Sequence, residues 1–278
     1  MTFNCELVGK VGSAALADRE NNDLNYNVLC KIARELRPGF VWVTSGAAEI
    51  GRLDYLRRND GVLMEGSREE IKTDCAAQGQ SVLMATYRQF APPYLSLRQF
   101  LVEHSHFNDP AKREHLKDAL VRCFSQKAVP IINYNDPVSN EETRKTEIHA
   151  LKEKGIPVVE CVDNDETASK IALLLHAKYL LIYTSTDGIL YDPADASSLI
   201  REITASTPAG LATEINKCKM YCDGKTTAGT GGALAKLSYV EEAAMLGTTV
   251  FISSPKYKIS DILSANAPST RIKLKDAE

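Results

Sequence analysis

Two lysines, one near each end of the chain, stand beside glycine-rich turns. Lys10 lies in VGKVGSAAL (residues 8–16), and Lys236 lies in GTGGALAKL (residues 229–237). Glycines let a backbone approach phosphate oxygens, and a helix start offers unpaired N–H donors to an anion. Two such lysines would grip a phosphoryl group from both sides and neutralise the charge that develops during transfer. Taken alone, the first segment is better explained as a plain strand-to-helix turn, because it matches neither the P-loop nor the Rossmann fingerprint.

A second small-residue turn lies in VTSGAAEIGR, residues 43–52. Ser45, Gly46 and the N–H groups that follow them would form a seat for a carboxylate or a phosphate. The alternative interpretation is that the small residues only permit close packing of a helix against the sheet.

Polar side chains also collect at the end of the strand in VPIINYNDPVS (residues 129–139) and within VDNDETAS (residues 162–169). Helix capping or a turn explains any one of them, and Asp163 or Asp165 would be a normal cap. Together they exceed what two turns require, which favours a binding site. These polar residues are Asn133, Asn135, Asp136, Asp163, Asn164 and Asp165.

The elements that must position these residues alternate between short β-rich runs and longer helical patterns. This alternation predicts an α/β fold around a mainly parallel sheet. We expect strands at 5–9, 40–44, 95–102, 129–133, 179–184 and 248–252. We expect helices at 25–37, 47–58, 69–90, 110–127, 165–177 and 232–247. Three segments break the pattern: a polar flap at 59–68, a hairpin with a DPAD turn at 187–204, and a charged, glycine-rich loop at 213–232.

Composition narrows the class of protein. The 278 residues carry a formal charge of -3, so no global field favours nucleic acid or an anionic membrane. The seven cysteines are scattered, which is typical of reduced core residues, and the Cys218/Cys222 pair lacks partners for a metal site. No signal peptide or membrane span is evident, so we expect a cytoplasmic protein. The five histidines, including His104 and His106, are interpreted as surface or packing residues.

The ordered motifs resemble the amino acid kinase superfamily, and most closely its glutamate 5-kinase branch, which opens proline biosynthesis. The matching segments are VGKVGSAAL, VTSGAAEIGR, AAQGQSVLMATYRQF, VPIINYNDPVS, VDNDETAS, LLIYTSTDGILYDP and GTGGALAKL. The resemblance implies a three-layer αβα sandwich with a central, mainly parallel sheet. It implies a single domain over residues 1–278, with the amino acid bound by about 1–160 and ATP by about 161–278.

The resemblance also assigns roles to residues. It implies that Lys10 and Lys236 grip the transferred phosphoryl group and that Asp165 orients them. It implies amino-acid contacts from Ser45, Gly46, Asp136 and Asn164. It implies nucleotide contacts from Gly12, Ser13, Thr184, Ser185, Thr230, Gly231 and Gly232. The implied cofactors are ATP and Mg²⁺ carried by the nucleotide, with no metal held by the protein itself, and the implied assembly is a homodimer or tetramer.

The resemblance implies ATP-dependent phosphorylation of the side-chain carboxylate of L-glutamate. This reaction needs no general base, because a side-chain carboxylate with a pKa of about 4.3 is already ionised at neutral pH. Two positions depart from the pattern of the branch, which commonly has Asp at Ser185 and Gly at Val162. The chain is also too short for the C-terminal RNA-modification-type domain of many relatives.

Three alternatives stay open: a kinase of the superfamily with another small carboxylate, phosphonate or phosphate substrate, a silent amino-acid or nucleotide sensor, and a dinucleotide-dependent oxidoreductase.

Overall fold

The computed structural model describes residues 4–18, 20–155, 157–222 and 232–275. Within these ranges the strands are β1 (Cys5–Val11), β2 (Ala17–Asp18), β3 (Asp23–Leu24), β4 (Phe40–Thr44), β5 (Ser96–Val102), β6 (Ala128–Tyr134), β7 (Ala177–Tyr183), β8 (Glu202–Ala205), β9 (Thr249–Ser253) and β10 (Thr270–Leu274). The α-helices are α1 (Ser13–Leu16), α2 (Tyr26–Glu35), α3 (Ala47–Arg58), α4 (Arg68–Phe90), α5 (Ser105–Asn108), α6 (Pro110–Ser125), α7 (Glu141–Glu153), α8 (Asn164–Leu174), α9 (Pro208–Cys222), α10 (Ala233–Met245) and α11 (Ile259–Leu263).

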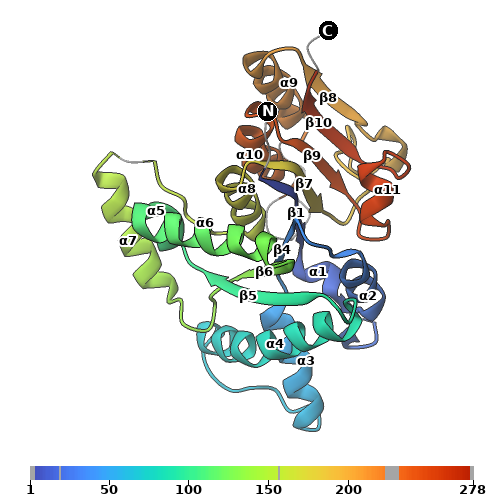
Figure 1. Cartoon of the computed structure of the whole chain (residues 1–278). Coiled ribbons are helices and arrows are strands. Elements are labelled where there is room, and N and C mark those ends of the chain that lie inside the picture. Colours follow the sequence, from blue (N-terminus) through green and yellow to red (C-terminus); the bar gives the residue numbers. More distant parts are fainter. Residues whose placement is uncertain (1–3, 19, 156, 223–231, 276–278) are drawn as a thin grey trace. The chain divides into compact units, whose positions relative to one another are not determined.

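An eight-stranded sheet has the order β5-β6-β4-β1-β7-β9-β10-β8, and β2 and β3 form a separate pair (Figure 1). Every strand that the sequence predicts is present, within three residues of its expected ends. The contacts within the chain divide it into two compact units. Unit 1 comprises residues 1–11, 37–43 and 163–278, and unit 2 comprises residues 12–36 and 44–162. The single-domain prediction stays a prediction.

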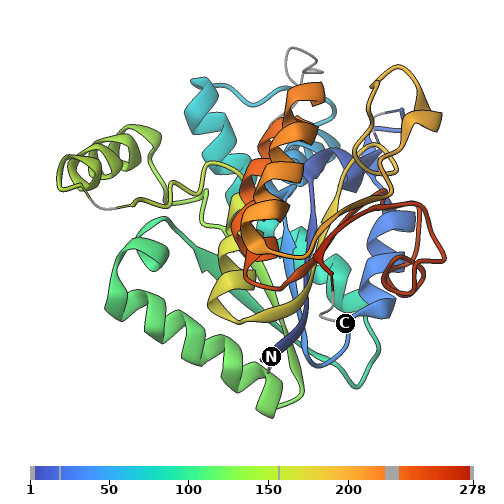
Figure 2. The same ribbon diagram turned by 90° about the horizontal axis from the view of Figure 1, so that it is seen from above.

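In unit 1, β1 pairs in parallel with β7, and β7 pairs in parallel with β9. The pair β9–β10 is antiparallel, whereas β8–β10 is parallel. Helices α8 and α9 both pack against α10, and α8 also packs on β1 and β7 (Figures 1 and 2). This packing brings the start of α8 and the start of α10 to β1, which carries Lys10.

In unit 2, β5 and β6 pair in parallel from Ser96–Ala128 to Val102–Tyr134. Helices α3 and α4 cross very closely because glycines lie at the crossing. A Cβ atom on Gly51 would stand 1.8 Å from the carbonyl oxygen of Cys75, and one on Gly79 would stand 1.9 Å from that of Ala47. The small residues of 43–52 therefore serve helix–helix packing in unit 2.

Two of the irregular segments differ from their expected form. Residues 187–204 do not form a regular hairpin: a single antiparallel bridge joins Leu190 and Leu199, and β8 pairs with β10 instead. The expected loop at 213–232 is helical as far as Cys222, because Leu211, Ile215, Cys218 and Cys222 bury one face of α9. The rest of that segment, apart from Gly232, lies outside the described residues.

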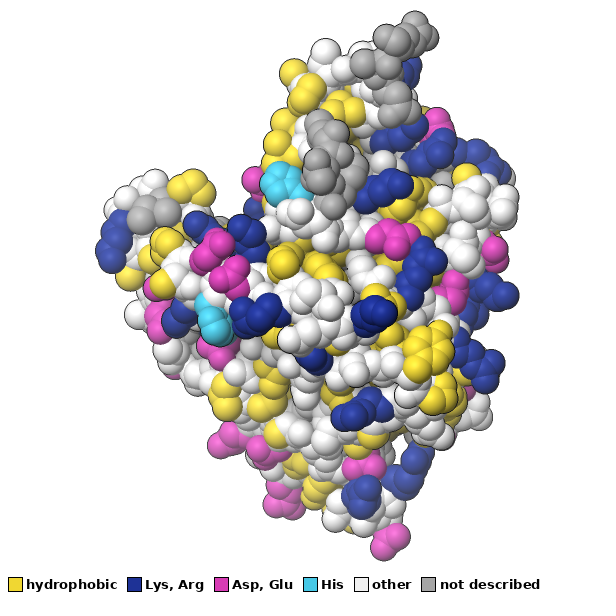
Figure 3. All heavy atoms as spheres, viewed as in Figure 1, with side chains coloured by type: hydrophobic (Ala, Val, Ile, Leu, Met, Phe, Trp, Pro, Cys, Tyr) yellow, Lys and Arg dark blue, Asp and Glu magenta, His cyan; other side chains and the backbone are white. Residues whose placement is uncertain are grey.

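The surface carries both signs of charge. On the face shown in Figure 3, Lys and Arg side chains are intermingled with Asp and Glu. Among the described residues, none of the helices has both the length and the apolar character needed to cross a bilayer.

Candidate active site

Asp165 is the centre of a buried ion cluster in unit 1. Its Oδ1 lies 2.6 Å from Lys10 Nζ, and its Oδ2 lies 2.7 Å from Lys236 Nζ. Asp165 is 0% exposed and Lys10 is 5% exposed. Because removing charges from water costs several kcal/mol per ion, a buried ion cluster adds little net stability. Its presence therefore favours a functional role, and the structure brings the three residues together from β1, α8 and α10.

The two aspartates at the start of α8 have different tasks. Asp163 is the N-cap, and its side chain accepts a hydrogen bond of 2.9 Å from the backbone N–H of Asp165. Its Oδ1 also lies 3.8 Å from Lys10 Nζ. Since Asp163 caps the helix, the carboxylate of Asp165 is left to face the lysines. The capping interpretation thus holds for Asp163 and fails for Asp165.

Lys10 is held by the strand that carries it. The neighbouring Gly9 lies under the ring of Trp42, and a Cβ atom on Gly9 would stand 2.0 Å from Trp42 Cζ3. Trp42 is fully buried and packs against Tyr183 with 5.9 Å between ring centroids. The absence of a side chain at Gly9 therefore meets a packing need of the strand.

Lys236 is held by the contacts between α8 and α10. Ser169 donates a hydrogen bond of 2.5 Å to the carbonyl oxygen of Tyr239, and Lys170 Nζ lies 2.6 Å from Glu242 Oε2. Gly232 is the N-cap residue of α10, and no side chain of the described residues caps this helix. Its first-turn N–H groups and the two lysines are the donors that a phosphate requires.

The remaining predicted residues of the nucleotide side lie in three places. Thr184 and Ser185 directly follow β7, and the Thr184 N–H donates 2.8 Å to the carbonyl oxygen of Ser253. Gly12 and Ser13 lie in unit 2, where Gly12 precedes α1, a helix of only four residues. Thr230 and Gly231 lie outside the described residues.

Ser45 and Gly46 lie at the start of α3 in unit 2. Gly46 is the N-cap of α3 and has a φ of 95°. A Cβ atom added to Gly46 would stand 3.2 Å from Leu16 Cδ1. This left-handed conformation favours glycine. Among the described residues no side chain caps α3, so the anion seat that the sequence predicts at its first N–H groups stays a prediction.

Asp136 follows β6 in unit 2 and forms an ion pair that the sequence does not predict. Lys72 Nζ on α4 lies 2.9 Å from Asp136 Oδ1. Three residues earlier, in β6, Asn133 donates a 2.8 Å hydrogen bond to Gln80 Oε1, and both side chains are buried. Gln80 belongs to the AAQGQ motif, so the sequence contained a signal that Gln80 is part of the site. The polar start of α4 contained no such signal for Lys72. Asn164, the fourth predicted amino-acid contact, opens α8 in unit 1.

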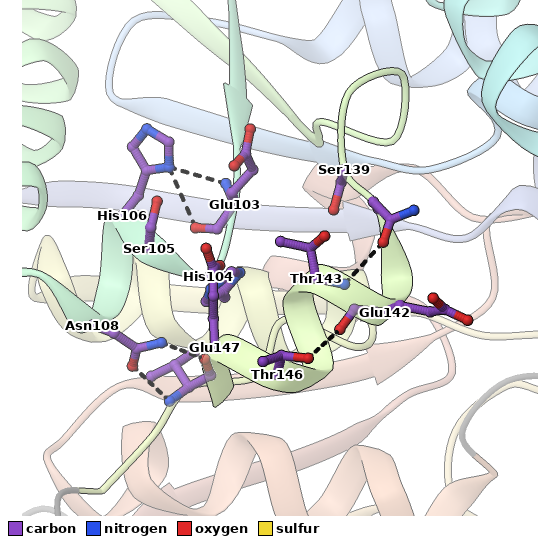
Figure 4. Close-up of polar contacts among 12 residues, drawn as sticks. Glu103, His104, Ser105, His106, Asn108, Ser139, Glu142, Thr143, Thr146 and Glu147 are labelled. Atoms are coloured by element: carbon purple, nitrogen blue, oxygen red, sulfur yellow. Dashed lines mark hydrogen bonds and ion pairs between the residues drawn. The ribbon is translucent and has the colours of Figure 1, made fainter. Parts of the chain in front are cut away.

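His104 and His106 lie at α5 in unit 2. His104 is 5% exposed, and its Nε2 lies 2.9 Å from Glu147 Oε2 on α7 (Figure 4). Asn108 makes two hydrogen bonds of 2.8 Å to the backbone of Val159, beyond α7. These contacts tie α7 and the segment after it to α5. Within the described ranges, His, Cys, Asp and Glu side chains do not gather in threes in a metal-binding arrangement.

The family model for the "Amino acid kinase family" matches residues 6–254. The chain belongs to this family. Because the family consists of phosphotransferases, the expected class of enzyme is confirmed at the level of the family.

Several curated proteins are similar along most of the chain. A "Glutamate 5-kinase" of Geobacillus thermodenitrificans is 30% identical, with 96% of this chain and 67% of that protein covered. One of Shouchella clausii is 27% identical, with 95% and 66% covered. A "Delta-1-pyrroline-5-carboxylate synthase" of Solanum lycopersicum is 31% identical, with 89% and 34% covered. The chain thus spans about a third of the length of the synthase and two thirds of that of the kinases.

Solved structures of two other kinases share the fold. Carbamate kinase from Giardia lamblia bound to AMP-PNP has a TM-score of 0.59 at 18% identity, with 98% of this chain and 99% of that chain covered. UMP kinase from Ureaplasma parvum has a TM-score of 0.53 at 13% identity, with 97% and 99% covered. The predicted α/β class with a mainly parallel central sheet is thereby confirmed.

Proposed function

We propose that this chain is an ATP-dependent kinase that phosphorylates the side-chain carboxylate of L-glutamate to γ-glutamyl phosphate, the first step of proline biosynthesis. The observation that carries the proposal is the cluster of Lys10, Asp165 and Lys236. One buried carboxylate that binds two lysines, next to a helix start that no described side chain caps, suits a phosphoryl group in transfer.

The work of the protein in this reaction is positioning and charge neutralisation. Asp165 holds the two lysine side chains at its two oxygens. Both ammonium groups therefore lie around one carboxylate and need no rearrangement during transfer. When bound, ATP with Mg²⁺ on its phosphates supplies the transferable phosphoryl group. Lys10 and Lys236 then offset the negative charge at that group, and the N–H groups at Gly232 add further donors. Thr184 and Ser185 are proposed nucleotide contacts.

The amino acid would be held by opposite charges. Asp136 is assigned to the ammonium group, and the N–H groups after Ser45 and Gly46 are assigned to a carboxylate. Asn164 is assigned a further polar contact. The names of the relatives support glutamate and the proline route, since they are glutamate 5-kinases and pyrroline-carboxylate synthases.

The second candidate is a kinase of the same family for another small acid. It is favoured by Ser185, where the glutamate 5-kinase pattern has Asp, and the fold is equally that of carbamate and UMP kinases. The departure at Val162 weighs less, because the left-handed backbone before the aspartates falls on Cys161 (φ 52°) and not on Val162. A silent sensor explains neither lysine of the buried cluster.

Hydroxylamine trapping tests the proposal, because acyl phosphates react with hydroxylamine to give a hydroxamate, which forms a coloured complex with iron(III). We expect hydroxamate from L-glutamate, ATP and Mg²⁺. Lys10→Met and Lys236→Met should each lower kcat by about a hundredfold or more, with glutamate affinity within threefold. Methionine leaves Asp165 paired with the other lysine, so these variants should fold.

Lys178→Met is the matched control, because Lys178 is an exposed lysine on β7 of the same unit. It should keep wild-type turnover. Product from another small acid but none from L-glutamate would favour the second candidate. Full turnover in both site variants would refute the assignment of the lysines.

A further inference from the structure

The ion pair between Lys72 and Asp136 has unused hydrogen-bonding capacity on both sides. Lys72 Nζ lies 2.9 Å from Asp136 Oδ1. An ammonium group has three donors and a carboxylate about four acceptor positions, so one contact satisfies neither group. The Lys72 side chain is 62% exposed and that of Asp136 is 23% exposed, so both groups are accessible. An exposed pair contributes at most about 1 kcal/mol to stability, which gives no structural reason for it.

Several carboxylates surround this pair. Glu69 accepts a 3.0 Å hydrogen bond from the backbone N–H of Glu141, and Glu103 accepts one of 2.7 Å from Asn135, the residue before Asp136. Lys145 is bound to Glu141 at 2.6 Å. The pKa of Glu141 is lowered, mainly by the hydrogen bond from Lys145 and to smaller extents by the charges of Arg144 and Lys72. Of these three cations, Lys72 is the one that the structure pairs with Asp136.

An α-amino acid head group is a zwitterion, with an ammonium and a carboxylate on one carbon atom. A lone Asp136 would attract the ammonium but repel the neighbouring carboxylate, and the nearby glutamates would add to that repulsion. A lysine beside the aspartate removes this conflict, because each charge of the head group then meets its opposite.

We propose that Lys72 and Asp136 together form the seat for the α-carboxylate and α-ammonium of the amino acid, so that Lys72 determines specificity for α-amino acids. The proposal rests on the proposed function, which assigns the ammonium group to Asp136. L-Glutamate has two carboxylates, so this assignment leaves the N–H groups of α3 for the side-chain carboxylate. Lys72 is a binding residue in this scheme and does not touch the transferred group.

Calorimetric titration with two ligands tests the proposal. 4-Aminobutyrate keeps the ammonium and the distal carboxylate of glutamate but lacks the α-carboxylate. Lys72→Met should weaken L-glutamate binding about tenfold, the usual effect of losing one charge-assisted hydrogen bond, and leave 4-aminobutyrate unchanged. Asp136→Asn should weaken both ligands. Lys72→Arg should restore most of the glutamate affinity.

The matched control is Lys117→Met, which removes a partly exposed lysine paired with Glu114 on α6 of the same unit. It should bind L-glutamate as the wild type does. Unchanged or tighter glutamate binding by Lys72→Met would overturn the proposal, as would equal weakening of both ligands. The proposed function fails separately, if the wild type binds L-glutamate but forms no hydroxamate with ATP.

Discussion

At the scale of single residues, Asp163 and Asp165 show how neighbouring carboxylates take different roles. The first satisfies a helix N–H group, and the second has no helix partner to satisfy and faces two lysines. Their spacing of two residues decides this. Asp163 is the N-cap and lies just outside the helix, whereas Asp165 is the second residue inside it. A carboxylate in the first turn also interacts favourably with the helix dipole.

Gly9→Ala should destabilise the protein, although alanine usually favours the folded state by reducing the freedom of the unfolded chain. The added methyl group would stand 2.0 Å from Trp42 Cζ3, so the ring or the strand must move. We expect a loss of about 1–3 kcal/mol in the free energy of unfolding, measured in urea, together with lower turnover because Lys10 is the next residue.

A Trp42→Leu background provides the control for this steric argument. The smaller side chain leaves room for the new methyl group, so Gly9→Ala should cost less there than in the wild type. An equal cost in both backgrounds would contradict the contact as its cause.

At the scale of elements, the crossing of α3 and α4 gives a prediction with an unusual sign. Gly79→Ala should destabilise by about 1–3 kcal/mol, because the methyl group would stand 1.9 Å from the Ala47 carbonyl oxygen. At an exposed helical position, alanine is instead better than glycine by about 1 kcal/mol.

Ala77, which is exposed on the same helix, supplies the comparison. Ala77→Gly should lose about 1 kcal/mol through helix propensity alone. Urea unfolding of both variants measures the difference. If Gly79→Ala stabilised the protein, the helices would not be as close as described.

The sequence predicts elements well where burial leaves a pattern. The strands on both sides of Lys10 and Asp136 are short apolar runs, and all were expected. Helix α7 was not expected because only Ile148 on it is buried, so no apolar stripe marks it. Helix α9 was not predicted for another reason. The lysines in this segment make it read as a charged loop, although four of its residues form one buried face.

The site was predictable to the extent that its residues belong to motifs. Lys10, Asp165 and Lys236 each lie in a recognisable segment, and the structure places them in contact. Lys72 was not predictable, because a lysine in the polar first turns of a long helix is indistinguishable from any solvated residue. Only the fold shows that α4 brings it to the end of β6. The roles themselves stay predictions until turnover is measured.

At the scale of the whole molecule, buried thiols make stability depend on alkaline pH. Burial raises the pKa of Cys5 to about 12, and burial also raises the pKa of Cys75, Cys123 and Cys218. An unfolded thiol loses its proton near pH 8.5, whereas a folded one with a raised pKa keeps it. The unfolded state therefore binds fewer protons above about pH 8.5, and the free energy of unfolding should fall as pH rises.

Urea unfolding at pH 8 and pH 10 checks this expectation. The contribution of Cys5 is at most about 1.4 kcal/mol per pH unit. Cys5→Ala should therefore show a shallower decline than the wild type. Equal declines would mean that the Cys5 thiol does not contribute to the alkaline loss.

Trp42 is the only tryptophan among the 278 residues, and it lies on Gly9, directly before Lys10. Its burial means that the tryptophan fluorescence of this protein comes from one indole in an apolar setting, with Tyr183 beside it as an energy donor. The emission therefore reports on a single place, the strand that carries a lysine of the buried cluster. A shift of that emission to longer wavelength records the opening of this strand without any attached dye.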